Sequence, residues 1–221
     1  MEKEIYLVRH GETLFNYFYK MQGWSDTPLT KKGVAQAQRA GRELAQVPFD
    51  LAIASDLGRA VHTCREIVKL NRNADQLQVQ EMPEFREVYF GSFEGMDGDW
   101  VERQIFASHM DSMSGSEAPF FQSGFKNILK FTKEADPYHV AENYDDFWRR
   151  LDPVWSKLRK SPAKKILVVS HGLAIRLIAD RYGDGHFDLV KGANGAITRL
   201  ILTDDDVQVK TYAEIHLPDS E

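Results

Sequence analysis

Residues 5–11 read IYLVRHG: four apolar residues end abruptly at Arg9, His10 and Gly11. A short run that is apolar on both faces is typical of a strand in the interior of a parallel sheet. The pattern returns late in the chain, where residues 166–172 read ILVVSHG. The carboxyl ends of the strands in an open parallel sheet border the ligand crevice. We therefore expect His10 and His171 to project into one site.

Strand and helix patterns alternate downstream of the first strand. A helix is predicted from Thr30, which can serve as its N-cap, to Pro48, because the apolar residues between them recur with a period near 3.6. Residues 50–54, DLAIA, predict the next strand, after which Ser55 and Asp56 are expected to cap a helix that carries Arg59. This order predicts an α/β fold, a three-layer sandwich with a mostly parallel central sheet.

The second half of the chain completes the sheet after an interruption. A helix is predicted from Leu173 to about Arg181, followed by strands at 196–202 and 207–213 that an acidic turn joins into a hairpin. Residues from about 96 to 143 break the rhythm and predict a helical or irregular insertion within one domain spanning residues 1–221. Such an insertion is either decoration of the fold or, slightly favoured, a cap over the substrate.

Composition restricts the class of protein and of partner. The chain has 221 residues, of which 43% are hydrophobic and 28% charged, as in ordinary globular proteins. Its formal charge of -5 would repel nucleic acid, so no nucleic-acid partner is expected. A single cysteine, Cys64, forms no intrachain disulfide, and the sequence shows no signal peptide and no 18-residue apolar run. We expect a cytoplasmic protein without a membrane partner; the oligomeric state stays open.

The two histidines at strand ends allow three interpretations. A metal site needs a further ligand at matched spacing, and the sequence has no HxxxH, HExxH or HxH, so no metal is expected. Two buried structural histidines are a second interpretation, weakened by the glycine that follows each one and lets backbone approach a ligand. The third adds Arg9 and Arg59, whose guanidinium groups bind phosphate bidentately. Arg59 could instead form a surface ion pair with Asp56.

Five motifs in order resemble those of the histidine phosphatase superfamily, also called phosphoglycerate mutase-like. They are RHGET at 9–13 with Asn16, QGWSDTPLT at 22–30, SDLGRAVHT at 55–63, REVYFGSFEG at 86–95 and SHG at 170–172. The resemblance covers nearly the whole chain outside the insertion. It implies a phosphoglycerate mutase-like fold with the insertion as its cap.

The resemblance also implies a role for each matching residue. His10 would be the nucleophile that becomes a phosphohistidine, and Glu87 would be the acid and base that serves the leaving group and then water. His171, Arg9, Arg59 and Asn16 would hold the phosphoryl oxygens, with Gly23 and Gly172 also in the phosphate-binding site. No cofactor is implied.

The same residues serve either hydrolysis or phosphoryl transfer. The mutases of this family have extra basic residues after the acid-bearing loop, whereas residues 96–101 here read MDGDWV. The segments FGSFEG and QGWSD resemble the phosphatase branch. We therefore expect a phosphomonoesterase acting on a small phosphorylated metabolite. The alternatives are phosphoglycerate mutase-type transfer and, less favoured because all the reactive residues are present, an inactive binding homologue.

Overall fold

In the computed structural model, which describes residues 2–107 and 124–217, six strands form one sheet in the order β3-β2-β4-β1-β5-β6. The bounds along that order are Val79–Glu81, Leu51–Ala54, Lys165–Ser170, Lys3–Arg9, Ile197–Leu202 and Val207–Glu214. The first four strands are parallel, and β5 pairs antiparallel with both β1 and β6. The predicted mostly parallel sheet is confirmed. Because Arg9 and Ser170 are register partners, His10 and His171 leave adjacent strands at the same level.

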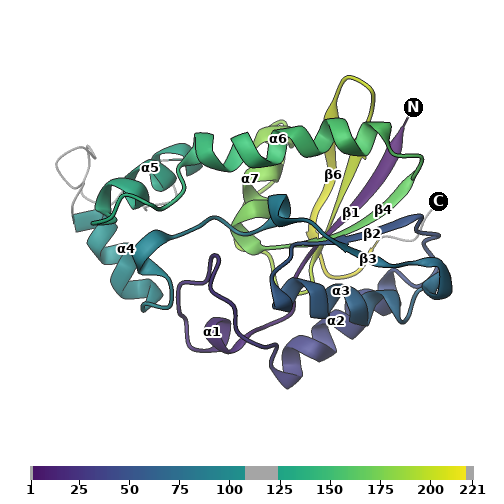
Figure 1. The fold of residues 1–221 in the computed structure, drawn as a ribbon, viewed down its shortest axis with the longest axis horizontal. Coiled ribbons are helices and arrows are strands. Elements are labelled where there is room, and N and C mark those ends of the chain that lie inside the picture. The colour runs from purple at the N-terminus through teal and green to yellow at the C-terminus, as the bar shows by residue number, and fades with distance from the viewer. Residues whose placement is uncertain (1, 108–123, 218–221) are drawn as a thin grey trace.

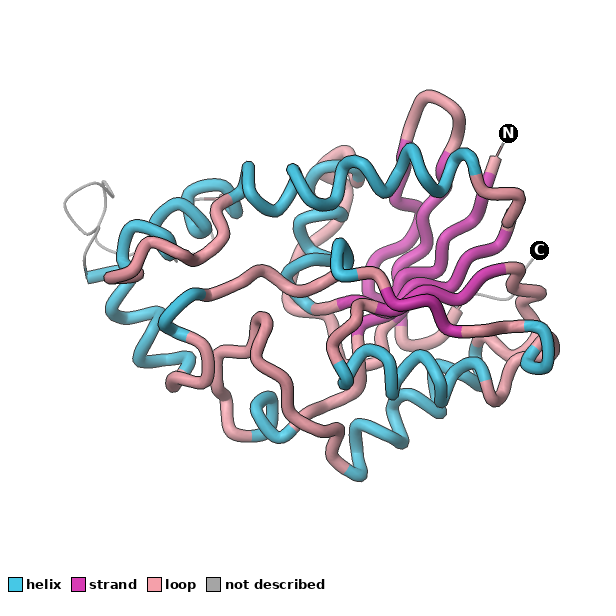
Figure 2. Tube along the Cα trace, viewed as in Figure 1, coloured by secondary structure: helices cyan, strands magenta, loops and turns pink. Residues whose placement is uncertain are grey.

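Helices cover both faces of the sheet (Figures 1 and 2). Ile5 and Leu7 of β1 belong to a core shared with α6 (Tyr144–Lys160) and α7 (Gly172–Tyr182). The alternate residues, Tyr6 and Val8, belong to a second core shared with α2 (Lys31–Glu43) and α3 (Gly58–Val68). Both faces of β1 are therefore buried, which explains why this strand is continuously apolar. The α/β sandwich expected from the sequence is confirmed.

The ends of the helices follow the sequence in part. Thr30 caps α2 as predicted, its hydroxyl oxygen accepting from the Gly33 amide at 3.0 Å, but the helix ends at Glu43, well before Pro48. The predicted cap at Ser55 and Asp56 is wrong: Leu57 occupies the N-cap of α3 and makes no side-chain cap bond. Asp56 is instead held by Arg86, whose Nε donates to its carboxylate at 2.7 Å.

Two helices follow Met96 and lie beyond the carboxyl ends of the parallel strands (Figure 1). They are α4 (Gly98–Ala107) and α5 (Phe125–Ala135), and the residues between them, 108–123, lie outside the described part of the chain. The short α1 (Leu14–Tyr17) lies below them in this view. Three short 3-10 helices complete the described elements, η1 (Ala74–Gln76), η2 (Pro83–Phe85) and η3 (Gly91–Phe93). None of the helices described is long and apolar enough to cross a membrane.

Candidate active site

The turn after β1 fixes the backbone of His10. A Cβ atom on Gly11 would lie 2.2 Å from the carbonyl oxygen of Gly33, so only glycine fits where this turn meets α2. The Gly11 amide donates to the Thr63 hydroxyl at 3.0 Å, and the Asn194 side-chain amide donates to the carbonyl of His10 at 2.9 Å. The turn is thus held by two hydrogen bonds and one close backbone contact from three other segments of the chain.

A hydrogen bond with the backbone fixes the tautomer of the His10 ring. Its Nδ1 lies 2.8 Å from the carbonyl oxygen of Gly11, and because a carbonyl only accepts, Nδ1 carries the proton. Nε2 therefore carries the lone pair, and Arg59 Nε donates to it at 3.3 Å. The ring is 3% exposed. The lone pair on Nε2 of His10 is therefore held in a fixed direction.

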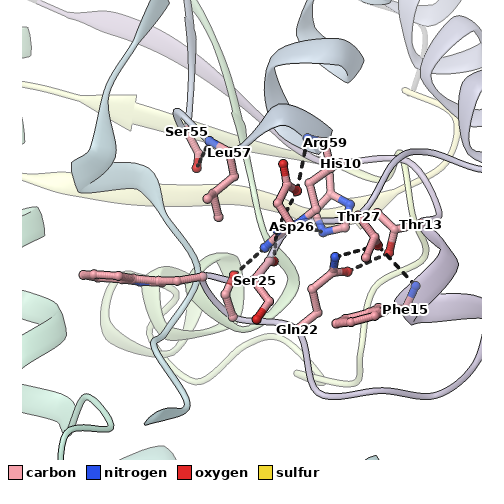
Figure 3. Close-up of polar contacts among 12 residues, drawn as sticks. His10, Thr13, Phe15, Gln22, Ser25, Asp26, Thr27, Ser55, Leu57 and Arg59 are labelled. Atoms are coloured by element: carbon pink, nitrogen blue, oxygen red, sulfur yellow. Dashed lines mark hydrogen bonds and ion pairs between the residues drawn. The ribbon is translucent and has the colours of Figure 1, made fainter. Parts of the chain in front are cut away.

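Arg59 is anchored by the loop that carries the QGWSD motif (Figure 3). Its Nη1 donates to the carbonyl of Ser25 at 2.8 Å and to Asp26 at 3.0 Å, and its Nη2 donates to the carbonyl of Gly23 at 2.6 Å. The amide of Gly23 is bonded to Glu94 at 3.1 Å. Gly23 therefore contacts the predicted site through Arg59. The ion pair of Arg59 is with Asp26, so the alternative of a surface pair with Asp56 is wrong.

The second histidine lies against the first. The ring centroids of His10 and His171 are 5.1 Å apart with an interplanar angle of 59°. His171 is fully buried, and within the described residues neither of its ring nitrogens nor the Nε of Arg9 has a hydrogen-bond partner. Buried polar atoms without partners are costly, and these atoms suit an anion that accepts from them.

Burial and the neighbouring arginines keep both rings uncharged. Burial is the largest cause that lowers the pKa of His10 well below its ordinary value, followed by the charges of Arg59 and Arg9. The pKa of His171 is lowered in the same direction by burial and then by Arg59. A neutral imidazole can attack an electrophile, so this environment preserves the nucleophilic form of His10.

Glu87 lies at the N-terminus of α7, next to His171. Its carboxylate oxygens accept from the amides of Leu173 at 2.9 Å, Ala174 at 2.8 Å and Val88 at 3.0 Å. The side chain is buried, and these three amides fix the position of its carboxyl group at the start of α7. Glu87 and His10 line the same pocket.

This pocket has a volume of about 190 Å³ and two contrasting walls. The wall at the strand ends includes Arg9, His10, Asn16, Glu87 and Gly172. The opposite wall is largely apolar and comes mainly from the two helices after Met96; its residues are Val101 and Ile105 of α4, Ile128 and Thr132 of α5, with Met21, Phe90 and Leu173. The remaining lining residues come from several segments; they are Gln22 and the charged residues Lys20, Glu102, Arg176 and Lys191.

The structure gathers the residues that the sequence singled out. Five of them line the pocket, and Arg59 and His171 contact His10 at its edge. Asn16 is held by Asn194, whose Nδ2 donates to its Oδ1 at 3.2 Å. Sequence reasoning missed Asn194 because an asparagine followed by a glycine is typical of a turn and carries no catalytic signal. Among the described residues no cluster of three or more His, Cys, Asp and Glu could hold a metal ion.

Comparisons with known proteins agree with this geometry. The sequence profile described as histidine phosphatase superfamily (branch 1) matches residues 5–215. The chain is 42% identical over 181 residues to an adenosylcobalamin/alpha-ribazole phosphatase of Escherichia coli K12, covering 80% of this chain and 77% of that protein. It is 29% identical over 195 residues to a 2,3-bisphosphoglycerate-dependent phosphoglycerate mutase of Haemophilus ducreyi, covering 80% and 83%. A crystal structure of phosphoglycerate mutase from Bacillus anthracis superposes with a TM-score of 0.86 at 27% identity, covering 97% and 94%.

Proposed function

The chain belongs to the histidine phosphatase superfamily, and from that premise we propose that it hydrolyses phosphate monoesters through a phosphohistidine formed on His10. One observation carries the proposal. The Gly11 carbonyl fixes the proton on Nδ1 of His10, which leaves the Nε2 lone pair beside Arg59 in a pocket that Arg9 and Glu87 also line. A nucleophile, cationic donors for an anion and a carboxyl group are thus present in one cavity.

In the first half-reaction Nε2 of His10 attacks phosphorus and the bond to the ester oxygen breaks. Glu87 gives its proton to the departing oxygen, so an alcohol leaves and a phosphohistidine remains. Arg9, Arg59, Asn16 and His171 hold the phosphoryl oxygens, and the unpartnered nitrogens of Arg9 and His171 support this role. Gly23 acts through its carbonyl bond to Arg59, and Gly172 gives the anion room beside Arg9.

In the second half-reaction the carboxylate of Glu87 takes a proton from water. The resulting hydroxide attacks phosphorus, the N–P bond breaks, and phosphate and neutral His10 are released. The low pKa of His10 suits it to this step as well, since the ring leaves as an uncharged group. Residues of the chain supply the nucleophile, the acid and the base, so the proposed reaction requires no metal.

We propose a small phosphorylated metabolite with an apolar part as the substrate. The segment around α4 and α5 acts as a cap whose apolar side chains face the pocket, and an organic group of the ester packs against them. The Escherichia coli relative is named for alpha-ribazole and adenosylcobalamin, which makes nucleotide-like esters a sensible first group to test.

Phosphoglycerate mutase-type transfer is the second candidate. It is supported by the mutases among the relatives and by the superposition on a mutase structure. Against it, the α4 residues that line the pocket, Val101, Glu102 and Ile105, offer no positive charge to a substrate carboxylate. The positive side chains of the lining, Lys20, Arg176 and Lys191, come from other segments. The two reactions separate in an assay with 3-phosphoglycerate and 2,3-bisphosphoglycerate, where a mutase forms 2-phosphoglycerate and a phosphatase releases inorganic phosphate.

The proposed chemistry is tested by trapping the intermediate. Purified protein is mixed with p-nitrophenyl phosphate in the presence of EDTA, quenched in alkali and digested for mass spectrometry. We expect steady release of nitrophenol and a phosphate adduct on the peptide that contains His10. Turnover without any adduct on His10, or turnover that requires added metal, would contradict the proposal.

A further inference from the structure

Arg150 on α6 binds the segment that carries Glu87 without reaching the pocket. Its Nη1 donates to the carbonyl of Glu84 at 2.7 Å, and its Nη2 donates to the carbonyl of Glu87 at 2.9 Å. Its Nε donates to Glu142 at 2.7 Å, and Nη2 also contacts the second oxygen of that carboxylate at 3.0 Å. The guanidinium is stacked over the Phe147 ring, 4.7 Å from the centroid. All five contacts orient one planar group.

Glu142 completes the attachment from the other side of Glu87. Its Oε2 accepts from the Tyr89 amide at 3.0 Å, and its own amide donates to the Tyr89 carbonyl at 2.8 Å. The ion pair between Arg150 and Glu142 is mostly buried, with 16% and 11% of the side chains exposed. The pair therefore holds residues 84 to 89 at both ends, with Glu87 in the middle.

This segment has little regular structure of its own to fix the acid. It connects η2 to η3, and no strand or α-helix includes Glu87. The Glu87 carbonyl receives one further bond, from Nε1 of Trp24 at 2.9 Å. The α7 amides hold the carboxyl of Glu87, while Arg150 and Trp24 hold the peptide group that follows it. Because the side chain joins these two attachments, a shift of the backbone anchor would pull the carboxyl out of place relative to His10.

We propose that Arg150, together with Glu142, is a positioning residue for proton transfer by Glu87. The inference rests on the acid and base role proposed for Glu87 above. A guanidinium is needed because its rigid fork serves two carbonyls and a carboxylate at once, whereas a lysine ammonium offers a single compact charge. Loss of Arg150 leaves the carboxyl in the pocket but displaced, and a displacement of about 1 Å can cost roughly a hundredfold in rate.

The dependence on leaving group separates this role from a general loss of structure. p-Nitrophenolate leaves readily without a proton, whereas an alkoxide needs one, so a misplaced general acid slows alkyl esters far more. We measure kcat/KM, which reports formation of the phosphohistidine, for p-nitrophenyl phosphate and propyl phosphate. Arg150→Met is expected to lower the value for propyl phosphate about tenfold or more beyond its effect on p-nitrophenyl phosphate. Arg150→Lys should show the same selective loss.

The neighbouring arginine supplies a matched control. Arg149 lies on the same helix, has 72% of its side chain exposed and pairs with Asp146 at 2.7 Å. Arg149→Met should leave both kcat/KM values unchanged. Glu142→Gln keeps the size of its side chain and removes the charge, and it should reproduce the selective loss in part. If Arg150→Met does not fold, Glu142→Gln tests the positioning role in its place. Equal losses on the two esters, or no loss, would overturn the inference.

Glu87→Gln distinguishes failure of this inference from failure of the proposed function. If that variant shows the selective loss on propyl phosphate and the Arg150 and Glu142 variants do not, only the positioning role is wrong. If Glu87→Gln shows no dependence on leaving group, the acid role itself fails. In a Glu87→Gln background Arg150→Met should add no further selective loss, because both changes act on one proton transfer.

Discussion

The two walls of the pocket are held by different forces. At the strand ends, His10, Arg59 and Glu87 are buried and each is fixed by directional hydrogen bonds from other segments. On the helical side, Val101 and Ile128 present apolar side chains held by packing alone. Packing tolerates small changes of shape, but hydrogen-bond geometry does not. We infer that the strand-end wall determines the reaction and the helical wall determines which ester enters.

The largest expected effect comes from replacing His10, the proposed nucleophile in the strand-end wall. His10→Gln keeps a polar side chain but cannot form the phosphohistidine, so kcat should fall by about 10⁴-fold or more. Steady-state hydrolysis of p-nitrophenyl phosphate measures it, with circular dichroism to confirm the fold. If the variant retains more than a few per cent of the parent's activity, the strand-end wall does not determine the reaction.

A smaller effect is expected from a substitution at Arg59 that keeps the charge but changes the hydrogen-bond geometry. Arg59→Lys keeps the positive charge but loses the fork that binds Gly23, Ser25 and Asp26. We expect kcat/KM to fall by about 10²-fold, the usual cost of one donor to a transition-state anion. Arg65→Lys on the same helix is the control, because that side chain is 62% exposed and pairs only loosely with Glu81 at 3.8 Å. Similar values for the two variants would refute a directional role.

The contrast between the walls also explains what could be predicted from the sequence. Local patterns predicted β1 and β4, because a strand buried on both faces is continuously apolar and each one ends in a polar motif. They therefore placed His10 beside His171, although 160 residues separate them. Arg9 and Arg59 were candidates from their own positions, beside His10 and near the start of the helix after the second strand. Glu87 was identified only through the resemblance of its motif to that of the family.

Most side-chain contacts between distant segments were not predictable. Asp56 resembled a helix cap, but Arg86 binds its carboxylate and α3 begins two residues later. The short strand β3 was missed because Val79–Glu81 is too brief and too polar to show a period. The apolar side chains of α4 and α5 gave no sign of which of them would face a pocket, since core and pocket residues share the same helical spacing.

The third prediction concerns the loss of folding stability at acidic pH, which follows from the two buried histidines. In the folded chain the pKa values of His10 and His171 are well below 6.5, so the unfolded chain binds more protons between those values and about pH 6.5. Stability is therefore fully present above about pH 6.5 and falls as the pH decreases, by up to about 1.4 kcal/mol per pH unit for each histidine. Urea unfolding between pH 7.5 and 5, in buffers without phosphate, should show this slope.

A variant of His171 tests whether this residue contributes to the pH dependence of the unfolding free energy. His171→Asn replaces a titrating ring by a side chain that does not titrate, so its free energy of unfolding should depend less steeply on pH over the same range. The parent and the variant should differ most at the acid end, where the parent has lost the most. Parallel curves for the two proteins would mean that His171 is not a source of acid sensitivity.

The smallest expected effect concerns the helical wall. Ile128→Val removes one methylene group that faces the pocket, a loss of about 0.8 kcal/mol of apolar contact, or roughly fourfold in affinity at most. We expect the KM of phenyl phosphate to rise two- to fourfold, as the same contact predicts. The inhibition constant of inorganic phosphate should stay unchanged, because in the proposed site phosphate contacts only the strand-end wall. Ile178→Val on α7 is the control, since Ile178 is buried but does not line the pocket. A matching rise in the inhibition constant of phosphate would show that the helical wall supports the phosphoryl site as well, and the division between chemistry and selection would then fail.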